Sequence, residues 1–145
     1  MGNESQLLRK QPGHLLRRCY QKGLAIILDK LSNEEVTYLH LTVLMALNES
    51  GPCTQRSLSE IIAMEPSNVH PMLRRMRDNG LVDIEVSEED KRRSHIVMTP
   101  KGKTTLQKLL PCQYAASQEL LANLDETEKV EFLRLLEKVT CDPTP

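Results

Sequence analysis

The sequence predicts a mainly α-helical protein with a small β-hairpin wing, that is, a winged helix-turn-helix joined to a helical dimerisation body. Two short helical patterns flank a tight turn at residues 64–66, the periodicity changes from helical to alternating after Gly80, and both ends of the chain are leucine-rich. We expect one domain, 1–145, in which 33–99 form the winged helix-turn-helix and 13–32 with 100–140 form the dimerisation part.

Composition fits a globular protein, since 39% of the residues are hydrophobic and 27% are charged. The net charge of −1 gives no overall positive field, so DNA binding would require local positive charge. Residues 66–103 carry eight Lys and Arg against six acids, whereas residues 112–145 carry three against seven. Apolar runs long enough for a membrane span and a secretory signal are both absent from the sequence, which favours the cytoplasm and no membrane partner.

The N-terminal region is expected to be a flexible arm over residues 1–12, followed by a helix over residues 14–31. The side chains expected to point inward from that helix are Leu15, Cys19, Ala25 and Ile26. Gly23 lies inside it and marks a candidate position for close packing with another helix.

The next two helices have clear N-caps. Thr37 is expected to cap a helix that runs to Asn48, and Thr54 to cap a helix over residues 55–64 that packs through Leu58, Ile61 and Ile62. Cys53, between them, is a candidate for a one-residue strand.

Residues 66–80 resemble a DNA-recognition helix in their pattern. Pro66 suits a first helical position, and Gly80 suits a left-handed residue after the last turn. The apolar side is formed by Val69, Leu73 and Met76, and the polar side by Asn68, Arg74, Arg75 and Arg77. The alternative is an ordinary surface helix whose arginines are simply solvated.

Two β-rich runs follow, at residues 81–86 and 95–99, with a charged loop between them. A helix-turn-helix followed by a hairpin is typical of a winged helix, so the loop at 87–94 is the expected wing.

A long helical pattern begins at Thr99 or Pro100, and Pro111 inside it is expected to kink or break the helix. A capping box of Asp125 and Glu128 begins the last helix. Its apolar stripe consists of Phe132, Leu135, Leu136 and Val139. The terminal helices would bury their stripes in a homodimer, which would set two recognition helices about 34 Å apart; the alternative is packing within one chain.

Residues 90–93 (Asp-Lys-Arg-Arg) and 96–102 (Ile-Val-Met-Thr-Pro-Lys-Gly) resemble the D-x-R…L-T-x-x-G signature of the multiple-antibiotic-resistance regulator (MarR) family. Residues 79–82 (Asn-Gly-Leu-Val) are similar to the helix-to-strand junction of that family. Order and spacing match over about residues 13–140. The resemblance implies a dimeric winged-helix regulator that binds a pseudopalindromic operator in double-stranded DNA, usually as a repressor released by a small ligand.

The resemblance also implies roles for individual residues. Arg92 would enter the minor groove at the wing tip, and Asp90 would hold the wing by an ion pair. The full set of candidate DNA-binding residues is Ser67, Asn68, His70, Arg74, Arg75, Arg77, Lys91, Arg92 and Arg93. Pro71 departs from the family pattern inside the recognition helix, which makes a transfer of individual base contacts unsafe.

A shorter match concerns the effector. Residues 12–18 (Pro-Gly-His-Leu-Leu-Arg-Arg) are similar to the start of a subgroup that responds to aromatic acids or their thioesters. The candidate effector-binding residues are His14, Arg17, Arg18 and His40. An arginine can bind a carboxylate through two hydrogen bonds, and a histidine can donate to a phenol or carboxylate. The alternative is that the arginines form salt bridges and that His40 lies on the helix surface near its cap.

The sequence leaves other functions open as alternatives to a repressor released by a small ligand. Cys19 lies beside Arg18, and a thiol next to a positive charge suits an oxidant sensor, but Cys19 also fits a small buried apolar residue. A winged-helix module for architecture or assembly, without an effector, is a further alternative. The four histidines and four cysteines lack the spacing of a metal site, no cofactor motif is present, and no catalytic motif suggests an enzyme.

Overall fold

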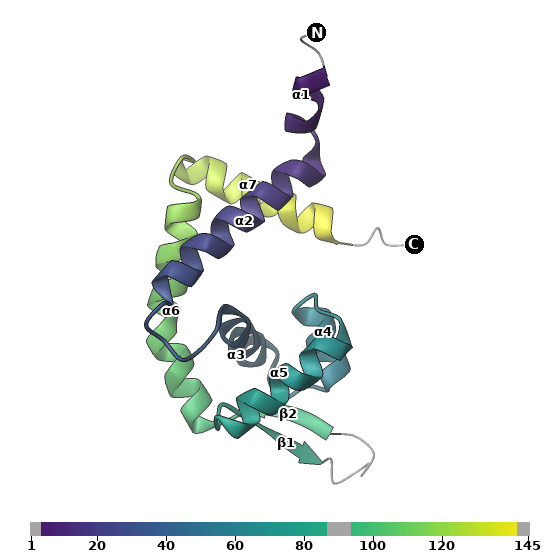
Figure 1. The fold of residues 1–145 in the computed structure, drawn as a ribbon, viewed down its shortest axis with the longest axis vertical. Coiled ribbons are helices and arrows are strands. Elements are labelled where there is room, and N and C mark those ends of the chain that lie inside the picture. Colours follow the sequence, from purple (N-terminus) through teal and green to yellow (C-terminus); the bar gives the residue numbers. More distant parts are fainter. Residues whose placement is uncertain (1–3, 87–93, 142–145) are drawn as a thin grey trace. The chain divides into compact units, whose positions relative to one another are not determined.

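The computed structural model describes residues 4–86 and 94–141, with side chains from residue 7 onward (Figure 1). Its elements, in chain order, are α1 (Glu4–Arg9), α2 (Pro12–Lys30), α3 (Tyr38–Ser50), α4 (Gln55–Ile61), α5 (Pro66–Asp78), β1 (Val82–Val86), β2 (Ser94–Met98), α6 (Pro100–Leu120) and α7 (Glu126–Thr140). Three helices followed by an antiparallel hairpin confirm the predicted winged helix-turn-helix.

The chain forms two compact units. Residues 28–113 are called the head unit, and residues 1–27 together with 114–145 are called the end unit. Helices α2 and α6 each run from one unit into the other. The expected winged helix-turn-helix segment, 33–99, lies within the head unit.

Helix α3 forms the centre of the head-unit core. Its buried residues are His40, Leu41, Val43, Leu44, Ala46 and Leu47. The Thr37 hydroxyl accepts a hydrogen bond from the His40 backbone N–H at 3.3 Å, which confirms the predicted N-cap. The predicted cap of α4 is confirmed in the same way, since the Thr54 hydroxyl accepts from the Ser57 N–H at 3.2 Å. Within that helix Leu58 is buried, but Ile61 is 48% exposed, so its predicted inward position was wrong.

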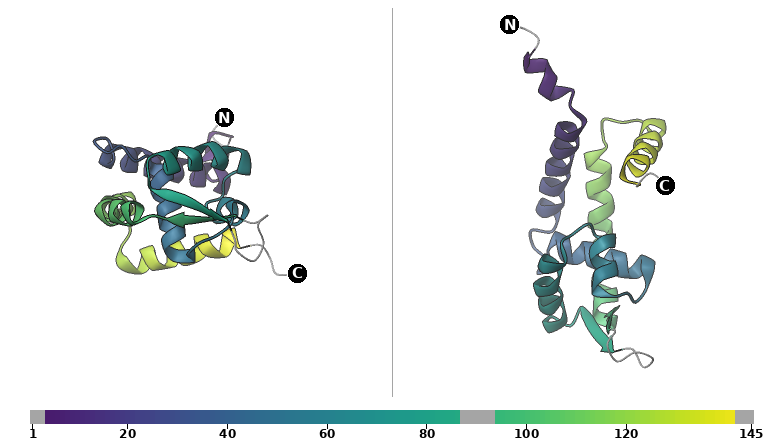
Figure 2. Two further views of the ribbon diagram at one scale, coloured as in Figure 1. Left: turned by 90° about the horizontal axis from the view of Figure 1, so that it is seen from below. Right: turned by 90° about the vertical axis from the view of Figure 1, so that its right-hand side faces the viewer.

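The hairpin follows α5 and leads directly into α6 (Figure 2). Its register pairs Val82 with Met98 and Val86 with Ser94. Cys53 forms the expected one-residue bridge to this sheet: its N–H donates to the Ile96 carbonyl at 3.3 Å, and the Ile96 N–H donates to the Cys53 carbonyl at 2.7 Å. The bridge fixes the hairpin to the segment that separates α3 from α4.

The turn between α4 and α5 contains a strained residue. Ala63 has a backbone φ of +53°, in the left-handed region where glycine is preferred. Its N–H donates to the Glu60 carbonyl at 3.2 Å, which closes the end of α4. The tight turn of the helix-turn-helix is therefore made at some cost in backbone energy.

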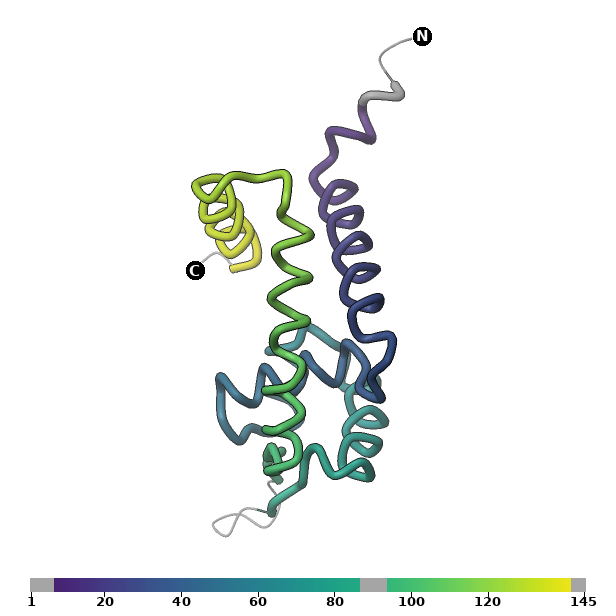
Figure 3. Tube along the Cα trace, turned by 90° about the vertical axis from the view of Figure 1, so that its left-hand side faces the viewer, coloured from purple at the N-terminus to yellow at the C-terminus, as the bar shows by residue number. Residues whose placement is uncertain are grey.

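In the end unit, α7 follows the end of α6 after a short turn (Figure 3). Asp125 and Glu128 form the predicted capping box, with both reciprocal hydrogen bonds at 2.9 Å. The prediction of close packing at Gly23 is supported, since an added Cβ would lie 3.1 Å from a methyl group of Leu120.

Two predictions for the N-terminal region were wrong. Residues 4–9 form helix α1 instead of a flexible arm, because residues 6–9 are all strong helix formers. Leu15 is 48% exposed and Ala25 is exposed, so neither points into a core of this chain. A periodic apolar pattern identifies a helix face that needs a partner surface, but it does not say which chain supplies that surface.

Pro111 does not break α6, which continues from Pro100 to Leu120. A proline removes one backbone hydrogen bond, and the buried Leu106 and Leu109 hold the preceding turns in place. In the part of the chain that the structure describes, no helix combines the length and hydropathy that a membrane crossing requires.

Candidate nucleic-acid interface

Helix α5 has one buried side and one exposed side. Val69, Leu73 and Met76 are at most 2% exposed and anchor the helix in the head-unit core, as predicted. Pro66 occupies the first turn, where its missing N–H costs nothing, and Glu65 is the N-cap residue without a side-chain cap bond. The buried side determines which residues face solvent.

The exposed side carries the candidate DNA-binding residues of the helix: Ser67, Asn68, His70, Arg74, Arg75 and Arg77. His70 forms a hydrogen bond between Nδ1 and Oε1 of Gln55 at 3.3 Å, which joins the exposed side of α5 to the first residue of α4. Gln55 carries no signal of its own in the sequence, because a contact between residues fifteen positions apart leaves no local pattern. The three arginines present guanidinium groups that suit phosphate oxygens or guanine edges.

Pro71 lies on the exposed side and within the continuous helix α5. Because proline has no N–H, the carbonyl of Ser67 receives no helical hydrogen bond from residue 71. The helix nevertheless continues to Asp78, since Val69, Met72 and Leu73 on either side of the proline are buried.

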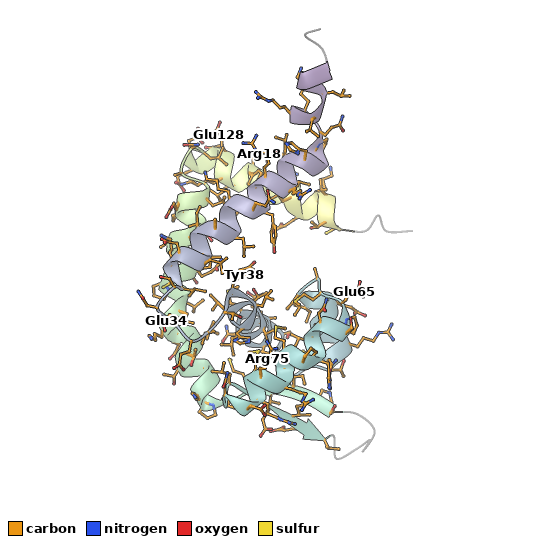
Figure 4. The ribbon with its side chains drawn as sticks, in the orientation of Figure 1. Arg18, Glu34, Tyr38, Glu65, Arg75 and Glu128 are labelled. Carbon is orange, nitrogen blue, oxygen red and sulfur yellow. The ribbon has the colours of Figure 1, made fainter. Side chains whose placement is uncertain are left out.

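His40 belongs to the reciprocal cap of α3. Its Nδ1 accepts a hydrogen bond from the Thr37 backbone N–H at 3.5 Å, and the side chain is 8% exposed. Burial, and secondarily the positive charge of Arg75, lower the pKa of His40 below its ordinary value. Figure 4 shows Arg75 on α5 and Tyr38 at the start of α3. The alternative that His40 is a helix-surface residue was therefore wrong, although its predicted position beside the Thr37 cap is confirmed.

The other candidate effector residues lie on α2 in the end unit. Arg17 and Arg18 are exposed and His14 is half-buried. Figure 4 labels Arg18 on this helix. His40 lies in the head unit, so a site shared by all four residues stays a prediction. Cys19, on the same helix, is a half-buried free thiol, and its redox role likewise stays a prediction.

The wing residues Asp90, Lys91, Arg92 and Arg93 lie outside the described residues. The hairpin that leads to them ends at Val86 on β1 and resumes at Ser94 on β2.

Two crevices in the described part of the head unit are lined in part by charged side chains. One, of about 540 Å³, follows the turn between α4 and α5 from Arg56 to Pro66. The other, of about 350 Å³, is lined by polar side chains, among them Lys101 and the ion pair of Glu34 and Lys108, whose Nζ and Oε2 atoms are 2.7 Å apart. Among residues 4–86 and 94–141, no three His, Cys, Asp or Glu side chains gather closely enough to hold a metal ion.

The arrangement of helix-turn-helix, basic exposed face and hairpin has counterparts among known proteins. The MarR family model matches residues 35–93. The transcriptional repressor NicR of Pseudomonas putida is 28% identical over 130 residues, which cover 90% of this chain and 82% of that protein. The transcriptional regulator MgrA of Staphylococcus aureus is 31% identical over 106 residues, which cover 72% of this chain and 69% of that protein.

A solved structure of BpsR from Bordetella bronchiseptica, described as showing the mechanism by which 6-hydroxynicotinic acid regulates its DNA binding, superimposes with a TM-score of 0.86. The two chains are 26% identical, and the match covers 92% of this chain and 96% of BpsR. The chain therefore belongs to the MarR family, whose members are DNA-binding transcriptional regulators and not enzymes.

Proposed function

We propose that this protein is a homodimeric repressor that leaves a pseudopalindromic DNA operator when it binds a small aromatic carboxylic acid or its thioester. The observation that carries the proposal is the similarity, over nine-tenths of the chain, to a named repressor and to a protein whose DNA binding responds to 6-hydroxynicotinic acid. Hydroxylated nicotinates are therefore the first effector class to test.

DNA binding is assigned to the exposed side of α5 and to the wing. Arg74, Arg75 and Arg77 give α5 a local positive charge that the protein as a whole, with its net charge of −1, does not have. In the proposal, this helix reads the major groove while Arg92, held by Asp90, enters the minor groove.

Dimerisation is assigned to the end unit. Val130 and Val139 of α7 are 69% and 73% exposed, Leu7 of α1 is 64% exposed, and Tyr114 of α6 is 66% exposed. Burying apolar area gains about 25 cal/mol per Å², so burial of these side chains against a second copy of the chain is favourable. A two-fold axis would then present two recognition helices to the two halves of an operator.

Effector binding is assigned to His14, Arg17 and Arg18 on α2. Their exposed or half-buried guanidinium and imidazole groups can reach a carboxylate or a phenolic oxygen. His40 has a weaker claim than the sequence suggested, because its Nδ1 is already engaged by the Thr37 N–H.

Release follows from a population shift. The ligand binds better to a dimer whose two head units are spaced wrongly for successive major grooves, and operator affinity falls by that difference in affinity. A ligand that bound both forms equally would release nothing.

The DNA assignment is tested by electrophoretic mobility shift on the DNA upstream of the chain's own gene. Arg92→Ala is expected to weaken operator binding strongly and to leave dimerisation, measured by sedimentation, unchanged. Arg74→Ala is expected to reduce the slope of log affinity against log salt by about one. Lys103→Ala, on α6, is the matched control. Equal affinity of Arg92→Ala and wild type at fixed salt would contradict the wing assignment.

The effector assignment is tested by thermal shift with nicotinates, benzoates and cinnamates. We expect a hydroxylated nicotinate to raise the melting temperature of wild type and to release the operator, and Arg17→Ala to lose both effects. Lys22→Ala removes a positive charge from the same helix and serves as the control. Operator binding that no ligand and no oxidant changes would favour an architectural module without an effector.

A further inference from the structure

The recognition helix α5 ends in a tightly closed turn. The Gly80 N–H donates to the Arg77 carbonyl at 2.8 Å, and the Leu81 N–H donates to the Met76 carbonyl at 2.9 Å. Gly80 has a φ of +72°, which lets the chain reverse direction directly after Asn79. This pair of bonds occupies the carbonyls of Met76 and Arg77, while the carbonyls of residues 79–81 accept hydrogen bonds from the segment that begins α6.

The start of α6 donates a hydrogen bond to each of those three carbonyls. The Thr99 hydroxyl donates to the Gly80 carbonyl at 2.5 Å, and the Lys101 ammonium donates to the Asn79 carbonyl at 2.8 Å. The Thr99 backbone N–H donates to the Leu81 carbonyl at 3.2 Å. We call these three bonds the α5–α6 clamp.

The clamp also caps α6. The Thr99 oxygen that donates to Gly80 accepts from the Gly102 N–H at 3.0 Å, in the manner of an N-cap side chain. A hydroxyl has one proton to donate and two acceptor sites, so Thr99 donates its only hydroxyl proton to Gly80, just after the recognition helix. Replacing Thr99 by valine keeps the shape and removes both bonds.

Gly102 brings the two backbones into direct contact. A Cβ atom at this position would collide with the carbonyl oxygen of Leu81 and with the Met98 side chain. On the other side of the clamp, a Cβ added to Gly80 would lie 3.6 Å from the Lys101 Cδ, so the lysine stem covers that glycine. The clamp therefore leaves little room for α5 and α6 to shift against each other.

We propose that Thr99 and Lys101 are positioning residues for DNA reading, which fix the orientation of the recognition helix to the first turn of α6. The argument rests on the proposed function, since it assigns the reading role to α5. Arg74, Arg75 and Arg77 occupy the part of α5 nearest the clamp, so a rotation of that end displaces the groups proposed to contact DNA.

Binding specificity separates positioning from simple stabilisation. Non-specific DNA binding needs only positive charge, whereas operator binding needs correctly placed side chains. At a temperature well below unfolding, Thr99→Val is expected to lower operator affinity roughly fivefold, which is about 1 kcal/mol. Affinity for a scrambled duplex should not change, and Thr99→Ser should restore operator affinity.

Matched controls exist on the same helix. Thr104→Val removes a hydroxyl that donates to the Pro100 carbonyl at 3.1 Å, within α6, and should leave the ratio of operator to scrambled affinity unchanged. Lys101→Met and Lys103→Met each remove one exposed positive charge. Only Lys101→Met should lower the ratio. An equal effect of the two lysine variants would overturn the proposal.

Hydrogen exchange tests the clamp without DNA, so it remains informative if wild type binds no operator and the proposed function fails. Thr99→Val and Lys101→Met should accelerate amide exchange in a peptide covering residues 76–82, and the two control variants should not. Unchanged exchange there, or an equal acceleration throughout residues 28–113, would show that the clamp does not position α5 and would overturn the inference.

Discussion

The head unit and the end unit bury their apolar residues to very different degrees. Helix α3 of the head unit has six buried residues, whereas helix α7 of the end unit has none among its fifteen. In the described part of the end unit, the buried apolar side chains are Ile27 and Ala116. Helix α7 is the more charged of the two helices, but it also carries an apolar stripe, and within this chain only the stripe of α3 is buried in a closed core.

The difference in burial indicates that the two units contribute to different properties of the protein. A core closed by the chain's own residues keeps the recognition helix in place in a single copy of the chain. A unit that leaves Val130 and Val139 largely exposed needs a further surface to reach a comparable burial. We therefore expect changes in the head unit to act on folding and changes in the end unit to act on association.

The largest effect is expected from Leu44→Ala. Leu44 is fully buried at the centre of the head-unit core, and alanine at this position leaves a cavity without lowering helix propensity. The free energy of unfolding should fall by about 3 kcal/mol, measured by urea denaturation. Leu133→Ala, at a position that is 51% exposed, should cost far less when protein concentration is low. Similar losses for both variants would abolish the distinction between the units.

Leu133→Asp is expected to act on the dimer instead. The substitution places a charge where the proposed interface would bury a leucine, and it does so once in each copy. Burying a fully exposed leucine is worth about 1.5–3 kcal/mol, and about half of the Leu133 surface is left to bury, so the two copies together should raise the dimer dissociation constant at least about tenfold. Sedimentation equilibrium measures this change. Thr127→Asp adds the same charge at another exposed position of α7 and should have little effect on association.

A smaller effect concerns pH and the head unit. Burial and Arg75 lower the pKa of His40 in the folded protein, so below the ordinary value of about 6.5 the unfolded chain binds more protons than the folded chain. Stability should be complete above that pH and should fall as the pH drops through it. His40→Gln keeps a side-chain acceptor for the Thr37 N–H but does not titrate. Between pH 7.5 and pH 5.5, the melting temperature of this variant should change less with pH than that of wild type. An equal change in both proteins would exclude His40 as the cause.

The smallest effect is expected from Ala63→Gly. Glycine at a φ of +53° removes the steric cost of a left-handed alanine, but it also makes the unfolded chain more flexible. The net gain should be at most about 1 kcal/mol in the free energy of unfolding. Ala122→Gly, at an exposed position of the end unit, offers the comparison, and a loss of stability in Ala63→Gly would show that the strain is balanced by contacts of the methyl group.

The features that were predicted correctly depend on residues that are close together in the chain. Thr37, Thr54 and the pair Asp125–Glu128 lie beside the helices that they cap, so each signal is complete within a few positions. The buried stripe of α5 followed from spacing alone. The exposed position of Leu15 could not be predicted, since an apolar stripe that meets another chain has the same sequence pattern as one that meets its own core.

The candidate site was predicted less completely than the fold. The exposed residues of α5 followed from helical periodicity. His40 lies beside Thr37, as its alternative interpretation expected, but it is buried and not on the surface. The bonds from Thr99 to Gly80 and from Lys101 to Asn79 join residues that are nineteen and twenty-two positions apart. Such contacts depend on how the hairpin returns the chain, which no local pattern contains.

Pro111 gives α6 an uneven stiffness along its length. Pro111 has no N–H to donate to the carbonyl of Gln107, so one hydrogen bond of the helix is missing. Pro111 lies two residues before residue 113, the last residue of the head unit in α6. Bending a helix costs least where its hydrogen-bond ladder is interrupted. Flexing of α6 would therefore concentrate near the unit boundary and leave its first turn, with Thr99 and Lys101, rigid.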